Sequence, residues 1–320
     1  MGGSESQVVA GVDVGGTNIG VGLVNADHDV TAEAEVSTPT DGPQAVAAAV
    51  ASLIASLDQK PGAIGLGVPG PVSDGVLLTA PNLAGFTEPV RLGDFVAERT
   101  GVPVVLGNDA SLGAVGEWVA GAGRGSRFLL GVWMGTGIGG GLVLDGRPYD
   151  GAFGGAGEFG HMIVQRGGAL CGCGRRGCVE AYAGRRAMER EAEVAIAAGV
   201  TTDLPQIMRD AGKDRLTSKV WKAAYEAHDP LATTILDQAV DALGVAIGSA
   251  VNLLDLDRIV VGGGLPEKFG QDLADRIAEA AEPWILAPSS HREVVVADLG
   301  DHSGIVGAAH VARSAPVRSP

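Results

Sequence analysis

The stretch VVAGVDVGGTNIGVGLV, residues 8–24, decides the fold class because it sets two apolar runs on either side of a glycine turn. Val8–Val14 and Asn18–Val24 both have the pattern of strands, and Gly15-Gly16 between them permits a tight reversal. Glycines in such a turn let backbone N–H groups face a phosphate, and the Thr17 hydroxyl adds a donor. The stretch therefore predicts a strand, a phosphate-binding turn and a second strand.

The carboxylate before this turn suits a magnesium ion. Asp13 lies at the end of the first strand, where it is placed to hold Mg²⁺ through water. We therefore expect a nucleotide's phosphates and its Mg²⁺ to contact Asp13, Gly15, Gly16, Thr17 and Asn18. A plain β-hairpin with an Asx turn is the alternative for this segment taken alone.

The same plan recurs further along the chain. Gly11, Gly15 and Gly20 are followed 120 residues later by Gly131, Gly135 and Gly140 (131 − 11 = 120). Such an echo predicts two α/β domains built on one plan, with a break near residues 110–125. Between and after these turns the patterns predict helices at 43–57 and 111–120, and strands at 64–68, 102–106, 258–261 and 293–297.

Two further glycine clusters indicate the rest of a nucleotide site. The run from Gly135 through Thr136 and Gly137 matches G-x-G-x-x-G, but a strand at Leu142–Leu144 follows it where a dinucleotide fold needs a helix. A hairpin that clamps phosphate is the better interpretation. A third cluster, which includes Gly263 and Gly264, joins a strand to a helix and is expected to hold the adenosine side, with a simple tight turn as the alternative.

Composition and charge narrow the class of protein. The 320-residue chain is 46% hydrophobic and has a net charge of −15, which disfavours nucleic acid and anionic membranes as partners. Residues 1–7 lack the features of a signal peptide, and polar residues interrupt the longest apolar run, at 240–254. We expect a cytoplasmic protein with a buried helix at that run and no membrane span.

The most specific local signal is a set of metal ligands. His161, Cys171, Cys173 and Cys178 suit tetrahedral Zn²⁺, and they use all three cysteines of the chain. Three cysteines within eight residues do not form a secreted disulfide framework. Four protein ligands leave no open position, so the zinc is expected to be structural. Unligated buried thiols are the alternative.

Two carboxylates flank these ligands. Glu158 precedes His161 by three residues, and Glu180 follows Cys178 by two. Carboxylates accept hydrogen bonds from sugar hydroxyls, and an imidazole that binds zinc through one nitrogen can donate through the other. Solvated or merely supporting glutamates are the alternative for this pair.

Taken together, these segments resemble the ROK family of bacterial sugar kinases and sugar-responsive regulators over nearly the whole chain. The resemblance is carried by residues 13–17, 67–70, 81–82, 108–109, 158–161, 171–180 and 262–264. It implies the actin/hexokinase-like (ribonuclease H-like) fold, in which two α/β domains close over ATP and a sugar. It also implies a small domain at 1–115 to which a helix at about 303–320 returns, and a large domain at 116–302 with the zinc knot.

The resemblance also implies roles for individual residues. Asp109 matches the family's general base and Asn108 a sugar ligand. Glu158, His161 and Glu180 match residues that hold ring hydroxyls, while Asn82 and Gly70 are further sugar neighbours. Read alone, Asp109 follows an apolar run and precedes a helix, so it is either a ligand-facing carboxylate at a strand end or a helix N-cap.

The resulting expectation is an ATP-dependent hexose kinase that resembles bacterial glucokinases and converts glucose to glucose 6-phosphate. N-acetylmannosamine, N-acetylglucosamine, fructose, mannose or an amino sugar are alternative substrates, because Asn18 and the run at 179–182 depart from the commonest family pattern. A sugar-sensing regulator is a more distant alternative, and a catalytically inactive sugar-binding protein is another. ATP and polyphosphate are both possible donors, with ATP favoured. Similar kinases are homo-oligomers, so we expect a dimer or tetramer.

Overall fold

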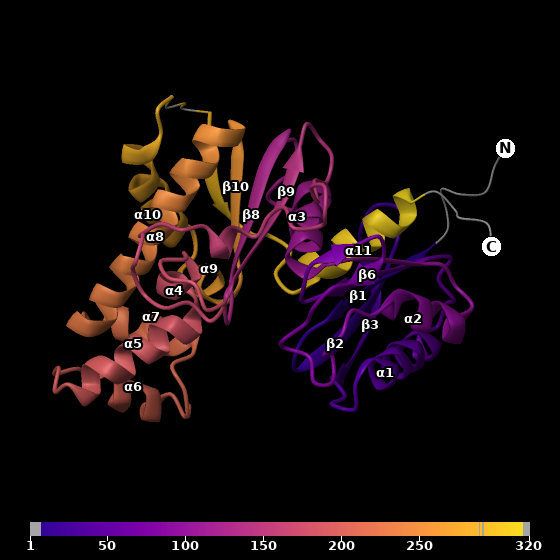
Figure 1. Ribbon diagram of the computed structural model, residues 1–320, viewed down its shortest axis with the longest axis horizontal. Helices are drawn as coiled ribbons and strands as arrows, with labels where there is room; N and C mark the ends of the chain where they lie inside the picture. Colours follow the sequence, from indigo (N-terminus) through magenta and orange to yellow (C-terminus); the bar gives the residue numbers. More distant parts are fainter. Residues whose placement is uncertain (1–7, 288, 290, 316–320) are drawn as a thin grey trace. The chain divides into compact units, whose positions relative to one another are not determined.

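The computed structural model describes residues 8–287, 289 and 291–315. The chain forms two compact units, each assembled from separate stretches of sequence (Figure 1). Unit 1 comprises residues 1–127, 141–157 and 298–320, and unit 2 comprises residues 128–140 and 158–297.

Unit 1 is built on a mixed sheet with the strand order β3-β2-β1-β4-β7. Its strands are β1 (Val9–Val14), β2 (Asn18–Val24), β3 (Val30–Ser37), β4 (Ile64–Val68) and β7 (Val104–Asn108). The glycine turn folds β2 back antiparallel to β1, whereas β1, β4 and β7 run parallel. The carboxyl ends of these parallel strands therefore lie along one edge of the sheet.

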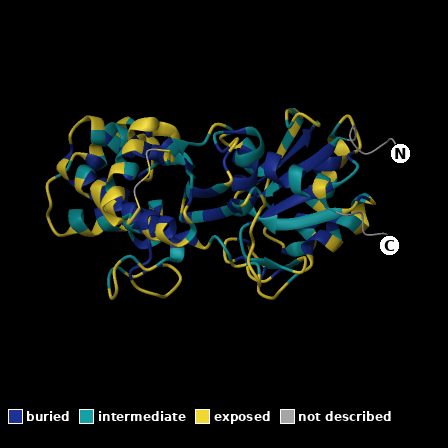
Figure 2. Ribbon diagram, turned by 90° about the horizontal axis from the view of Figure 1, so that it is seen from above, coloured by how far each residue is buried: buried dark blue, intermediate teal, exposed yellow. Residues whose placement is uncertain are grey.

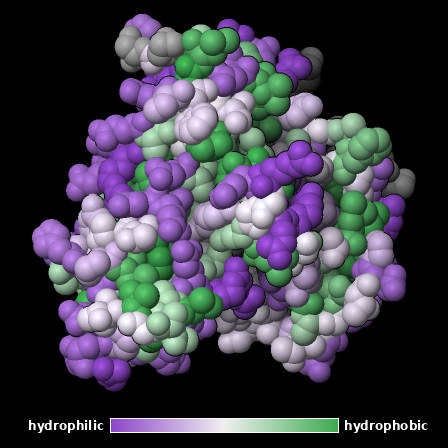
Figure 3. All heavy atoms as spheres, turned by 60° about the vertical axis from the view of Figure 1, so that its left-hand side comes forward, coloured by the Kyte–Doolittle hydropathy of each residue, from purple (hydrophilic) through white to green (hydrophobic). Residues whose placement is uncertain are grey.

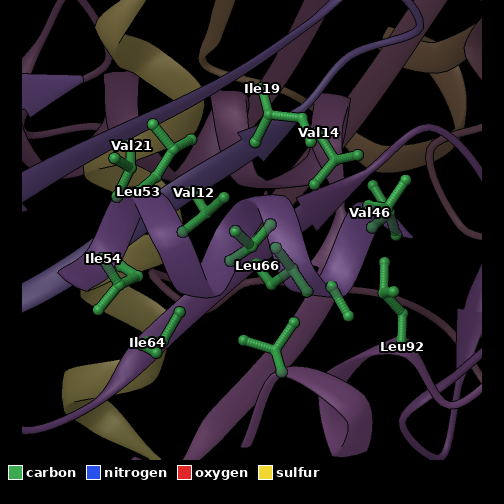
Figure 4. Packing of buried hydrophobic residues seen from close by; sticks show 14 of the residues in the cluster. Val12, Val14, Ile19, Val21, Val46, Leu53, Ile54, Ile64, Leu66 and Leu92 are labelled. Atoms are coloured by element: carbon green, nitrogen blue, oxygen red, sulfur yellow. The ribbon is translucent and has the colours of Figure 1, made fainter. Parts of the chain in front are cut away.

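Helices cover both faces of this sheet. On one face, α1 (Pro43–Ser56) and α2 (Leu92–Thr100) contribute Val46, Leu53, Ile54 and Leu92 to a core with the strand residues, among them Val12 (Figure 4). A short hairpin of β5 (Val72–Ser73) and β6 (Val76–Leu77) follows β4. On the other face, Ile305 and Ala309 of the C-terminal helix pack on Val9 and Val24.

That C-terminal helix, α11 (His302–Ser314), lies against the sheet and against α3 (Asp109–Ala120) at close range (Figure 1). A Cβ on Gly65 of β4 would stand 1.9 Å from the backbone oxygen of Ala308, and one on Gly307 would stand 1.8 Å from that of Leu112. Only glycine permits such backbone approach. In the structure, α11 therefore packs directly on the sheet of unit 1.

Unit 2 has a second sheet with the order β11-β10-β8-β9. Its strands are β8 (Phe128–Met134), β9 (Ile138–Leu144, which continues into unit 1 at Gly141), β10 (Arg258–Gly262) and β11 (Glu293–Val296). Its helices are η1 (Phe159–His161), α4 (Glu180–Ala183), α5 (Arg185–Ala197), α6 (Leu204–Asp210), α7 (Ser218–Glu226), α8 (Pro230–Leu254), α9 (Gly264–Phe269), α10 (Gln271–Ala281) and η2 (Glu282–Trp284). Figure 2 shows buried residues along the strands and exposed residues on the outer turns of the helices.

The two sheets share a topology, which supports the expected repeat. In unit 1 the order β2-β1-β4-β7 sets a glycine hairpin beside two parallel strands. In unit 2 the order β9-β8-β10-β11 does the same, with β8, β10 and β11 parallel. The glycine echo in the sequence thus marks the equivalent hairpin in each unit.

The predicted elements agree with the structure except at some ends. The strand expected at 102–106 is β7 at Val104–Asn108, and the helix expected from residue 111 begins at Asp109. β3 and α2 have no counterpart among the predicted elements.

One helix in the described part of the chain, α8, is long and apolar enough to cross a membrane by length and composition. However, 67% of its most apolar window is buried inside the structure, as expected for a core helix. Hydrophobic and hydrophilic residues are interspersed over the face shown in Figure 3.

A buried carboxylate joins the end of α3 to the segment that enters α11. Glu117 is 0% exposed, and its oxygens accept hydrogen bonds from the backbone N–H groups of Ala122, Asp298 and Leu299 at 2.9–3.0 Å. The Ser303 hydroxyl donates a fourth, at 2.9 Å. Because buried polar groups need partners, this cluster strongly favours one arrangement of the two segments.

We expect Glu117→Ala to destabilise unit 1 by about 3 kcal/mol or more, because it leaves several buried donors without an acceptor. Urea unfolding followed by circular dichroism measures the effect. Glu98→Ala, at an exposed position of α2, is the matched control and should change little. Equal unfolding midpoints for both variants would contradict the role given to Glu117.

Candidate functional site

Two of the predicted site residues, Asn108 and Asp109, lie at the carboxyl edge of the unit 1 sheet. Asn108 ends β7 and is the N-cap of α3, whose first residue is Asp109. The Asn108 side-chain oxygen accepts from the Ser111 N–H at 3.0 Å. The N-cap is therefore Asn108, and the alternative interpretation of Asp109 as the N-cap is wrong.

The Asp109 carboxylate is oriented by its immediate neighbours. Its Oδ1 accepts from the Ala110 N–H at 2.8 Å and from Asn108 Nδ2 at 3.1 Å. A carboxylate in the first turn of a helix interacts favourably with the positive end of the helix dipole. Asp109 is thus held at a strand-to-helix junction, the usual ligand edge of an open α/β sheet.

The two remaining predicted sugar neighbours of unit 1 have different contacts. Asn108 Nδ2 also donates to the backbone oxygen of Gly70, at 3.2 Å. Asn82 is exposed, and its backbone oxygen would stand 3.0 Å from a Cβ on Gly16. Gly70 therefore contacts Asn108 directly, and Asn82 contacts the first glycine turn.

The first glycine turn has the geometry expected of it. Gly15 N donates to the Asn18 oxygen at 2.9 Å, and the Thr38 hydroxyl donates to the Gly15 oxygen at 2.7 Å. These bonds hold the turn while Gly16, Thr17 and Asn18 remain exposed.

Asp13 lies just before this turn, near the first turn of α11. Burial, and to a lesser extent the charge of the nearby Asp301, together raise the pKa of Asp13 to about 6. A Cβ on Gly304 would stand 3.7 Å from its carboxyl carbon. A buried carboxylate of this kind gains most from a cation, because the cation offsets the desolvation of its charge.

Unit 2 contains the second glycine turn and ties it to the predicted sugar ligand Glu180. One Glu180 oxygen accepts from the Ile138 N–H at 3.0 Å, and the other stands 3.4 Å from Cys171 Sγ. A Cβ on Gly137 would stand only 2.2 Å from the same carboxylate. Glu180 therefore links the turn at residues 135–137 to the cysteines.

The third glycine cluster lies against the same turn. Gly263 has a φ of 89°, and a Cβ there would meet the backbone of Met134, the residue before Gly135, at 2.7 Å. Gly264 begins α9 and faces the Ser218 hydroxyl at the start of α7. Unit 2 thus brings Gly135, Gly263 and Gly264 into one neighbourhood, as a nucleotide site requires.

The four predicted metal ligands converge. The ligand atoms of His161, Cys171, Cys173 and Cys178 all lie within 4.8 Å of one another. The Cys173 and Cys178 sulfurs are 3.7 Å apart, and Cys171 Sγ lies 3.9 Å from His161 Nδ1. Thiolates about 2.3 Å from a tetrahedral zinc ion would be about 3.8 Å apart. The donors and their spacing fit such an ion.

The remaining nitrogen of His161 faces the other predicted carboxylate. Nε2 lies 3.9 Å from Glu158 Oε2, while Nδ1 faces the cysteines. The His161 and Glu158 side chains are 28% and 50% exposed, so both remain reachable by a ligand. The imidazole can therefore serve a metal on one side and a hydroxyl on the other.

The structure sorts the predicted residues into two groups, one in each unit. Unit 1 gathers Asp13, Gly15, Gly16, Thr17, Asn18, Gly70, Asn82, Asn108 and Asp109. Unit 2 gathers Gly135, Thr136, Gly137, Glu158, His161, Cys171, Cys173, Cys178, Glu180, Gly263 and Gly264. Sequence reasoning missed Glu117 and Arg185, whose side-chain partners lie as far as 186 and 49 residues away, so no local pattern marks either.

Comparison with known proteins agrees with this architecture. The chain is 34% identical to the glucokinase of Streptomyces coelicolor, over 95% of this chain and 96% of that protein. It is 32% identical to the N-acetylgalactosamine kinase AgaK of a Shewanella species, over 93% of this chain and 94% of that protein. Among solved structures, a ROK family glucokinase from Streptomyces griseus in complex with glucose and AMPPNP is similar to this chain, with 33% sequence identity and a TM-score of 0.81. The similarity covers 96% of this chain and 100% of that chain.

These similarities confirm the actin/hexokinase-like fold that the sequence resemblance implied. The model of the ROK family matches residues 9–315, which is nearly the whole described chain. The chain therefore belongs to the ROK family.

Proposed function

We propose that this chain, a sugar kinase of the ROK type, transfers the terminal phosphoryl group of ATP to a hexose hydroxyl, with glucose 6-phosphate as the product from glucose. The observation that carries the proposal is the position of Asp109. It begins α3 at the carboxyl edge of the sheet, with Asn108 and Gly70 bonded beside it.

Asp109 acts as the general base in this proposal. The attacking sugar hydroxyl loses its proton as the phosphoryl group is transferred, and a carboxylate within hydrogen-bond reach accepts it. The bonds from Ala110 and Asn108 occupy Oδ1 and orient the carboxylate. Most of the remaining acceleration comes from alignment and charge neutralisation.

The glycine clusters hold the donor. We assign the phosphates to the turn at residues 15–18 in unit 1 and to the turn at residues 135–137 in unit 2, with the adenosine side at Gly263 and Gly264. Asp13 holds the donor's Mg²⁺ through water. When bound, Mg²⁺ neutralises charge on the transferring phosphates.

We assign sugar binding to Asn82, Asn108 and Gly70, and to Glu158, His161 and Glu180. Glucose is the leading substrate because the glucokinase relatives are 33–34% identical over nearly the full chain. An N-acetylhexosamine is the second candidate substrate, because the N-acetylgalactosamine kinase relative is 32% identical to this chain.

The cysteine and histidine cluster holds a structural zinc ion in this proposal. Four protein donors complete a tetrahedron, so the ion stiffens the segment between His161 and Glu180 and does not act as a Lewis acid. Since Glu180 also bonds Ile138, the stiffening extends to the second glycine turn. We further propose that the enzyme has two functional lobes, with the domain bounds inferred from the sequence. We also propose that it is a cytoplasmic homo-oligomer and that it binds no nucleic acid.

A coupled assay with ATP tests the proposed reaction on a panel of glucose, N-acetylglucosamine, N-acetylmannosamine, fructose, mannose and glucosamine. We expect phosphorylation of at least one hexose, with the highest kcat/KM for glucose. A parallel series with polyphosphate identifies the donor. Activity only on another sugar would overturn glucose specificity, and inactivity on all of them would overturn the proposed reaction.

Asp109→Asn should lower kcat by about 10²–10⁴-fold while sugar affinity changes little, because it removes the proton acceptor but keeps the shape. Steady-state kinetics and glucose titration calorimetry measure the two effects. The control is Asp94→Asn, which changes an exposed aspartate in the first turn of α2. An Asp109→Asn enzyme with normal turnover would remove the general-base assignment.

Purified protein should contain about one zinc ion per chain by elemental analysis. Cys173→Ser should lose the metal and lower both the thermal midpoint and sugar affinity, because the metal organises the adjacent ligands. His291→Gln, outside the cluster, is the control and should retain zinc. Protein that purifies without metal, or a Cys173→Ser variant with unchanged zinc content, contradicts the site.

A further inference from the structure

The second glycine turn rests on the beginning of helix α5. The backbone N–H groups of Arg185 and Arg186 donate to the backbone oxygens of Gly135 and Thr136, both at 3.2 Å. The first residues of α5 thus dock directly under the turn. The positive end of the helix dipole lies beside the expected phosphate site.

The Arg185 side chain turns back to the same turn. Its Nη2 donates to Thr136 Oγ1 at 3.1 Å, and the side chain is only 22% exposed. Its Nε is buried and finds no hydrogen-bond partner in the part of the chain that the structure describes. A buried guanidinium N–H without a partner is costly, so this side chain would gain from a further acceptor.

The local charge balance is also positive. Glu189, whose side chain is 17% exposed, lies 3.8 Å from Arg185 Nε, which is too long for a hydrogen bond. The same carboxylate accepts from Arg215 Nη2 at 3.2 and 3.3 Å. One carboxylate therefore faces two guanidinium groups. Burial, and then the charge of Arg215, lower the pKa of Arg185, whereas the charge of Glu189 raises it.

We propose that Arg185 and Thr136 form an anion subsite that binds the phosphate chain of the nucleotide donor. The inference rests on the proposed function and deepens it by adding a charged donor ligand to the glycine turn.

The chemistry of the two side chains suits a phosphate. A guanidinium presents several donors in a plane and pairs closely with phosphate oxygens. Thr136 Oγ1 accepts from Arg185, so its own hydroxyl proton is left to donate. The net charge of −15 makes a local cation more important, because the rest of the protein repels a polyanion.

A purely structural role for Arg185 predicts a different dependence on the ligand. If Arg185 only supported the turn, its loss would lower the affinities for adenosine, ADP and ATP by similar factors. If it binds phosphate, the loss weakens ATP and ADP and leaves adenosine nearly unchanged. Comparison of these three ligands therefore separates the two roles.

The experiment is calorimetric titration of the full-length protein with ATP, ADP and adenosine, for the wild type, Arg185→Gln, Arg185→Lys and Arg190→Gln. Arg190 is the matched control on the same helix, exposed and bonded to the Leu170 oxygen. We expect Arg185→Gln to lower the affinity for ATP by about tenfold to a hundredfold, as for a lost charged hydrogen bond, and to leave the affinity for adenosine unchanged. Arg185→Lys should be intermediate and Arg190→Gln normal.

Two results would overturn the subsite: unchanged ATP affinity in Arg185→Gln, or equal losses for all three ligands. A wild-type protein that binds no nucleotide would instead overturn the proposed function, and the subsite with it. Glucose affinity in the same variants gives an independent measure of the fold and should not change with Arg185.

Discussion

The buried carboxylate of Glu117 is the contact on which the arrangement of unit 1 depends most. It accepts hydrogen bonds from the segment after α3 and from the segment that enters α11, which are far apart in sequence. Asp109 begins the same helix eight residues earlier, about two turns away. The contact that orders the C-terminal segment therefore also supports the helix carrying the proposed base.

Small residues make the same arrangement possible. Gly65 and Gly307 let α11 approach β4 and α3 until their backbones are in contact. A side chain at either position would separate the layers and remove the geometry that Glu117 needs. Some of the chain's 51 glycines therefore serve packing, in addition to those in the turns that suit phosphate.

In unit 2 the equivalent support comes from the cysteine cluster and from α5. Glu180 connects Cys171 to the turn through Ile138, and the first residues of α5 bond the carbonyl oxygens of that turn. The turn is thus fixed from two directions, while Thr136 stays exposed. This combination of a held backbone and an exposed hydroxyl is what preorganised phosphate binding requires.

The sequence by itself determined the family, the two glycine hairpins, the grouping of one histidine with three cysteines and the position of Asp109 at a strand end, because each depends on short runs of residues in the chain. Tertiary structure alone decided that Asn108 caps α3, that Glu117 joins α3 to the approach to α11, and that Arg185 reaches Thr136. Those contacts join residues up to 186 positions apart or depend on side-chain direction, and local periodicity carries no information about either.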